Sequence, residues 1–151
     1  LRAYHAPGHA PHQVVFFDPS TDVVFTGDAA GVYVPSIDEI RVNSAPPNFD
    51  AVECLDDVEM LRNLDPGTLC YSHFGPAETA DRLGEYERAL AEWVQAIAEK
   101  RHEQDSEEAV IEHFIEQAKS DPAWNDEHAE AEVRLNASGV LKYLDDKTEW
   151  D

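Results

Sequence analysis

The apolar residues of this chain follow two different patterns, and the pattern changes near Pro76. Before that position they form short runs of β-branched and aromatic residues, which are typical of strands. After it they recur three and four residues apart within long charged segments, a spacing that is typical of amphipathic helices. The sequence therefore predicts a mixed α/β (α+β) fold, with a strand-rich part first and a helical part after it.

The strand-rich part carries the signals of several strands separated by turns. Its β-branched and aromatic runs are bounded by Gly, Pro, Asp and Ser, the residues that favour turns. We expect strands at residues 2–4, 13–17, 23–26 and 68–72, the second and third of which form a hairpin. Prolines at positions 35, 46 and 47 predict an irregular segment over residues 32–48.

Four helices are expected. Asp50 is placed to cap the first, which runs to about residue 64 and has Leu55, Val58 and Leu61 on one face. The second helix spans about residues 78–102, the third starts after Ser106, which can cap it, and the fourth begins at about residue 126. Their expected inward residues are Leu83, Tyr86, Leu90, Trp93, Val94 and Ile97, then Val110, Ile111, Phe114 and Ile115, then Val133, Val140, Leu141 and Leu144. Trp124 and Trp150 are expected to be packing anchors.

The charge of the chain limits its partners. Thirty-two acidic residues against eleven basic ones give a formal net charge of −21. Binding phosphates requires Lys and Arg, so neither nucleic acid nor an anionic membrane is an expected partner. In molar salt the Debye length falls to about 3 Å and the repulsion among the carboxylates is screened, which leads to the hypothesis of a halophilic source.

The location and the redox state follow from simpler features. No apolar run approaches the roughly 20 residues that span a bilayer, and the first residues do not read as a signal peptide. The expected location is cytoplasmic. Cys54 and Cys70 form no CxxC pair, so we expect both to be reduced and buried. The start at Leu1, without Met, leads us to expect a fragment.

Three short segments place a His or Asp in a Gly- or Pro-containing loop directly after a predicted strand. They are Pro7-Gly8-His9, Thr26-Gly27-Asp28 and Ser72-His73-Phe74-Gly75-Pro76. Loops at the same end of neighbouring strands converge in space, and two imidazoles with one carboxylate suit Zn²⁺, Fe or Mn. Taken singly, each of these residues could equally be an ordinary turn residue.

The order of these segments adds a more specific signal. The stretch His5-Ala6-Pro7-Gly8-His9-Ala10-Pro11, a hairpin, and then Val24-Phe25-Thr26-Gly27-Asp28 resembles the central motifs of the metallo-β-lactamase superfamily. The segment at residues 72–76 resembles the last histidine motif of that family. The resemblance covers about residues 1–100. It implies the C-terminal half of an αββα sandwich, which we assign to residues 1–104, followed by a helical C-terminal extension at residues 105–151.

The resemblance also implies roles for individual residues. His9 would bind the first of two metals, Asp28 would bridge both as the catalytic carboxylate, and His73 would complete the second. His5 is in the motif but is not a ligand, and His12 lies at most behind the ligands. The HxHxDH segment, which supplies four further ligands in the family, is absent from the chain.

The implied function is that of a fragment of a metal-dependent hydrolase. Its parent would use two Zn²⁺ ions, or Fe or Mn, to activate water against a small-molecule ester, thioester, lactone or phosphodiester. With part of the site, the isolated chain is expected to be inactive and to self-associate through its uncovered sheet. Two alternatives stay open: an iron-dependent oxidoreductase on the same scaffold, and a non-catalytic helical interaction or dimerisation module.

Overall fold

The main sheet of the protein has five strands, seen in a computed structural model that describes residues 1–148. The strands are β1 (Arg2–His5), β2 (Val14–Asp18), β3 (Val23–Gly27), β6 (Thr68–Tyr71) and β7 (Pro76–Glu78), in that spatial order. Strands β1, β2 and β3 are antiparallel neighbours, which confirms the predicted hairpin. Trp150 lies outside the described residues.

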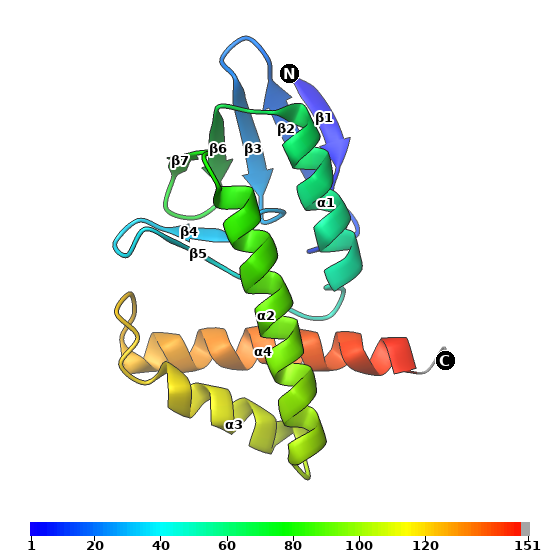
Figure 1. Cartoon of the computed structure of the whole chain (residues 1–151), viewed down its shortest axis with the longest axis vertical. Coiled ribbons are helices and arrows are strands. Elements are labelled where there is room, and N and C mark those ends of the chain that lie inside the picture. Colours follow the sequence, from blue (N-terminus) through cyan, green and yellow to red (C-terminus); the bar gives the residue numbers. More distant parts are fainter. Residues whose placement is uncertain (149–151) are drawn as a thin grey trace.

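The pairing of β3 with β6 is parallel, and this decides where the site forms. The chain leaves β3 and returns to β6 through helix α1 (Ala51–Leu64), which lies against the sheet (Figure 1). Gly27 is opposite Tyr71, so both strands end at the same edge of the sheet. The loops after them therefore start side by side, as predicted.

The sheet has one covered face and one open face. Alternate residues of the central strands are buried against the helices, among them Val15, Val24 and Leu69. On the other face Phe16 and Phe25 are direct cross-strand partners and are 45% and 48% exposed. An exposed pair of aromatic rings in the middle of a sheet marks a surface that favours contact with another apolar surface.

Three helices follow the sheet: α2 (Arg82–Glu103), α3 (Glu107–Ala118) and α4 (Asp126–Thr148). Helix α2 runs from the sheet to the end of the molecule where α3 and α4 lie, and α4 crosses it (Figure 1). The predicted caps are confirmed, because Asp50 accepts the amides of Val52 and Glu53 and Ser106 accepts that of Ala109. One hydrophobic core runs from the sheet through α2 into α3 and α4. The division at residue 104 stays a prediction.

The predicted inward residues of the last three helices are confirmed for the most part. Those of α3 are all buried. In the other two helices some are buried and some only partly so. Buried are Leu83, Tyr86, Leu90, Ile97, Val140 and Leu141, and partly buried are Trp93, Val94, Val133 and Leu144. None of the described helices is long and apolar enough to cross a membrane.

Three expectations about local structure were wrong. Residues 32–48 are not irregular throughout, because β4 (Val32–Val34) and β5 (Glu39–Arg41) form a separate hairpin, too short to give a periodic signal. Helix α2 begins at Arg82 and not near residue 78, because residues 76–78 pair with β6 as β7. In α1 Leu55 is 39% exposed, since the buried face is formed by Cys54, Asp57, Val58 and Leu61.

Candidate metal centre

His9, Asp28 and His73 meet at the edge of the sheet where β3 and β6 end. His9 Nε2 lies 3.7 Å from Asp28 Oδ2, and His73 Nε2 lies 3.4 Å from Asp28 Oδ1. The Asp28 carboxylate therefore stands between two imidazoles, one facing each of its oxygens. The structure brings the three predicted residues together, while their role as metal ligands stays a prediction.

The carboxylate of Asp28 is well placed but poorly satisfied. Its side chain is 23% exposed, yet Oδ1 is buried and accepts no hydrogen bond from residues 1–148. A buried carboxylate oxygen without a donor is costly unless a cation or a proton compensates it. The loop geometry fixes this position: Gly27 has a φ of 57°, and the Gly31 amide donates to the Asp28 carbonyl.

The orientation of His9 is set by a carbonyl that the sequence did not indicate. His9 Nδ1 lies 3.2 Å from the backbone oxygen of Asn43, which follows β5. In a neutral imidazole, donation from Nδ1 to this carbonyl would leave Nε2 with its lone pair, the form in which an imidazole binds a metal. His73 is more open, at 53% exposure, and Gly75 in its loop has a φ of 101°.

Gly8, directly before His9, is held by helix α1. Its amide donates to Asp57 Oδ2 at 2.8 Å, and its carbonyl accepts from the Asp50 amide at 2.9 Å. Burial raises the pKa of Asp57 to about 6, although the hydrogen bond from Gly8 lowers it. The sequence contains a signal for this residue, an acid at the helical spacing of Cys54, Val58 and Leu61, but it was not recognised.

Replacing Asp57 with Asn is expected to change how stability depends on pH. Because the folded carboxyl binds its proton more tightly than the unfolded one, the contribution of Asp57 to stability is greatest below about pH 4 and declines up to about pH 6. The amide oxygen of an asparagine side chain would still accept from Gly8, and the side chain would carry no charge. Relative to wild type, the free energy of unfolding of the variant should therefore rise by on the order of 2 kcal/mol as the pH increases from 4 to 7. Urea unfolding at several pH values measures the difference.

The exposed neighbour Asp56 provides the control for this change. Asp56→Asn removes the same charge from the same helix without touching a buried group. A gain at neutral pH that is equal in Asp56→Asn and Asp57→Asn would show that the effect comes from the net charge of the protein and not from burial.

The other histidines lie outside this cluster. His5 Nε2 is 2.7 Å from the Pro11 carbonyl oxygen and takes no part in the cluster, and His12 is exposed. His102 and His128 are exposed on helices, and His113 is half-buried. Cys54 and Cys70 form no disulfide bond. Cys54 is fully buried and Cys70 only partly so, which confirms the predicted burial for one of the two cysteines.

The donors fit part of a metal site and not a complete one. Two imidazole nitrogens and a carboxylate are donor types that Zn²⁺ prefers. Among residues 1–148, however, no three His, Cys, Asp or Glu side chains are placed so that they would hold one ion by themselves. This agrees with ligands divided between two metal positions that share Asp28, each of which needs further donors.

Comparisons with known proteins agree with this geometry. Residues 1–73, which contain all three site residues, match the sequence model of the metallo-beta-lactamase superfamily. A search of curated proteins found no match. The fold is similar to the crystal structure of an archaeal metallo-beta-lactamase superfamily protein from Sulfolobus tokodaii, with a TM-score of 0.58 and 20% identity.

That similarity extends over 93% of this chain and 45% of the archaeal protein, so this chain spans less than half of the length of that relative. The alignment includes most of the helical extension as well as the sheet. At this identity the likeness establishes the fold alone, and the sequence match establishes the family for the segment that carries the site. Residues 1–73 of this chain belong to the metallo-β-lactamase superfamily.

Proposed function

We propose that this chain supplies one half of the site of a metal-dependent hydrolase. The observation that carries the proposal is the Asp28 carboxylate with an imidazole facing each oxygen, at 3.7 Å and 3.4 Å. His9 and His73 would each bind one metal through Nε2, and Asp28 would be shared between them. The metals, when bound, supply a water of lowered pKa and a positive charge opposite the developing oxyanion.

The residues of the chain prepare this site in three ways. Asn43 fixes the His9 ring with Nε2 toward Asp28. The tight turn after β3 holds Asp28 at the sheet edge, with one oxygen buried and without a hydrogen bond from residues 1–148. His73, half exposed in its loop, is the ligand most accessible to a substrate. The proposed substrate is a small molecule with an ester, thioester, lactone or phosphodiester bond.

Metal content and zinc affinity test the proposal. The chain is purified without chelator in molar salt, and wild type is compared with His9→Ala, His73→Ala and the control His12→Ala. We expect weak zinc binding that falls at least about tenfold in the first two variants, since each loses a ligand. His12 is exposed in the same loop as His9, so its loss should change nothing.

The outcomes separate the alternatives. Equal zinc binding in all four proteins would contradict a site at these loops. Iron in place of zinc, lost in the same two variants, would favour an oxidoreductase over a hydrolase. The proposed setting is the cytoplasm of a cell with a high internal salt concentration, which a net charge of −21 favours.

We also propose that the isolated chain self-associates through the open face of its sheet. Val14, Phe16 and Phe25 gather there, with 39%, 45% and 48% of their surfaces exposed. Phe16→Thr/Phe25→Thr removes both rings and keeps the preference for strands. Light scattering in molar salt should show a dimer or larger species for wild type and a monomer for the variant, with Val52→Thr on α1 as the control. A monomeric wild type would contradict self-association.

A further inference from the structure

A cavity of about 460 Å³ lies between the sheet half and the helical extension, away from the metal centre. Its walls come from β5, α2, α3 and α4 together with Trp124, and none of His9, Asp28 and His73 lines it. A second hollow of about 250 Å³ shares Arg41, Trp93 and Trp124 with it. The volume is in the range of cavities that bind small molecules.

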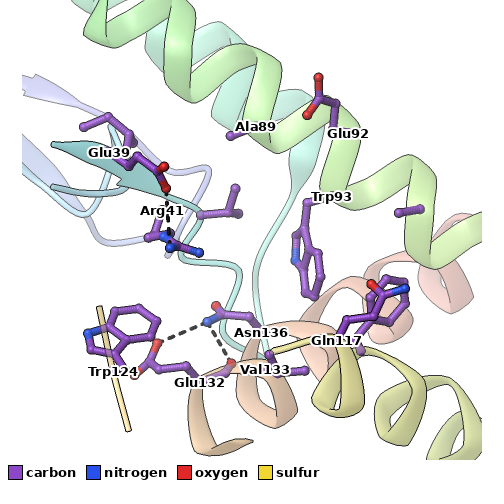
Figure 2. Close-up of a pocket in the computed structure, with 14 residues that line it drawn as sticks. Glu39, Arg41, Ala89, Glu92, Trp93, Gln117, Trp124, Glu132, Val133 and Asn136 are labelled. Atoms are coloured by element: carbon purple, nitrogen blue, oxygen red, sulfur yellow. Dashed lines mark hydrogen bonds and ion pairs between the residues drawn. The ribbon is translucent and has the colours of Figure 1, made fainter. Parts of the chain in front are cut away.

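Aromatic rings from separate elements form the apolar walls. Figure 2 shows Trp93 reaching from α2 into the space between β5 and α4, with Trp124 on the opposite side. The Trp93 ring is held in place, because its Nε1 donates to Ser44 Oγ at 3.1 Å. It also packs edge to face against the Phe114 ring, with 5.2 Å between the two ring centroids. The fixed Trp93 ring offers a negative π-face to a ligand without losing side-chain freedom when the ligand binds. Trp124 already stacks on His128, with 4.8 Å between the ring centroids, and serves as an apolar wall.

The charged side chains of the cavity are mostly carboxylates. Glu39, Glu92 and Glu132 line it, and its one basic residue is Arg41. The Arg41 guanidinium is already engaged, 3.2 Å from Asp121 and 3.4 Å from Glu39, and it stands over Trp124 at 5.7 Å. A ligand anion would meet a cation that two carboxylates already neutralise.

Among the described residues, two of these carboxylates form no ion pair with Lys or Arg, although the charge of Glu92 contributes to the raised pKa of Arg88, one turn earlier in α2. Within residues 1–148 Glu92 forms no ion pair, and Glu132 faces only His128 Nε2 at 3.7 Å while Oε2 accepts from Asn136. Negative charge beside a fixed aromatic ring, here Trp93, is the combination that recognises ammonium groups, through ionic attraction and cation–π contact together. We infer that this cavity binds a small organic cation, an ammonium group on a compact apolar body. The site is independent of the proposed hydrolase activity.

Three probes of one shape and different charge test the inference. They are choline, its neutral isostere 3,3-dimethylbutan-1-ol, and the anion 3,3-dimethylbutanoate. Binding to the full chain is followed by tryptophan fluorescence and calorimetry in 1 M NaCl, where non-specific attraction to the acidic surface is screened beyond about 3 Å. Choline should bind saturably, at least about tenfold more tightly than the alcohol, and the carboxylate should not bind.

Variants locate the binding. Glu92→Gln/Glu132→Gln should weaken choline binding at least about tenfold, while Glu59→Gln, on the exposed side of α1, should leave it unchanged. Equal affinity for choline and the alcohol, absence of choline binding, or an equal loss in the Glu59 variant would overturn the inference. The comparison of probes needs only wild type, so it decides the matter even if the double variant does not fold.

Discussion

Replacing Gly139 with Ala is expected to lower the free energy of unfolding by more than about 3 kcal/mol. Gly139 lies within α4 and faces the chain segment after β5, where an added Cβ would come within 1.6 Å of the Ser44 oxygen and 2.9 Å of the Pro46 nitrogen. These are backbone atoms, so no side-chain rotation relieves the contact. Alanine should add about 1 kcal/mol of helix propensity, and the clash outweighs it.

The clash should act mainly on the docking of the extension. To make room, α4 must move away from residues 44–46, which breaks the pair of hydrogen bonds between Ser44 and Asn136. Both bonds are buried, so their loss adds to the cost. Urea unfolding followed by tryptophan fluorescence measures the change, because Trp93 donates to the same Ser44 hydroxyl.

Gly84 provides a matched control. It also lies within a helix, but an added Cβ would meet only the ends of the exposed Asp81 and Arg88 side chains, which can move. Gly84→Ala should therefore be neutral or stabilise the protein by up to about 1 kcal/mol. Equal stability of Gly139→Ala and wild type would contradict the close approach of α4 to Ser44.

The convergence of the three site loops could be predicted because it depends on strand ends. Each of His9, Asp28 and His73 lies in a loop that follows a run that the sequence marks as a strand, and a parallel pair of strands brings its ends together. The caps at Asp50 and Ser106 are local signals of the same kind. Such features need only the order of residues along a short segment.

The supports of the site could not be predicted because they are contacts between distant segments. Asn43 reaches His9 across 34 positions of the sequence, through a backbone carbonyl that any residue would provide. Asp57 binds Gly8 across 49 positions. The hairpin of β4 and β5 could not be predicted for another reason. Each of its strands has three residues, which are too few to show the alternation of apolar and polar residues that marks a strand.

Gly8→Ala is the second change with a large expected effect, and it acts on the metal centre. An added Cβ would lie 2.4 Å from the Cys54 nitrogen, 2.5 Å from its Cα and 2.7 Å from its sulfur. The φ of Gly8 is not in the left-handed region, so the cost comes from crowding alone. The loop would have to lift from α1, at a cost of about 3 kcal/mol or more, and would lose the bond from the Gly8 amide to Asp57.

Because His9 is the next residue, a lifted loop also moves one ligand away from Asp28. Gly8→Ala should therefore weaken zinc binding at least about tenfold although every proposed ligand is retained. Unfolding in urea and a zinc titration of the folded protein measure the two effects separately. His12→Ala is the control: it changes a residue of the same loop without crowding the loop against α1, so it should leave the stability and the zinc affinity unchanged.

The source of the crowding can be tested in a Cys54→Ala background. That change removes the sulfur, while the Cys54 nitrogen and Cα stay where they are, within 2.5 Å of the added Cβ. Gly8→Ala should thus cost nearly as much in the Cys54→Ala protein as in wild type. If Cys54→Ala instead restored both stability and zinc affinity, the side chain and not the backbone of α1 would set the position of His9. Close packing of the loop on the backbone of the helix would then not be what aligns His9 with Asp28.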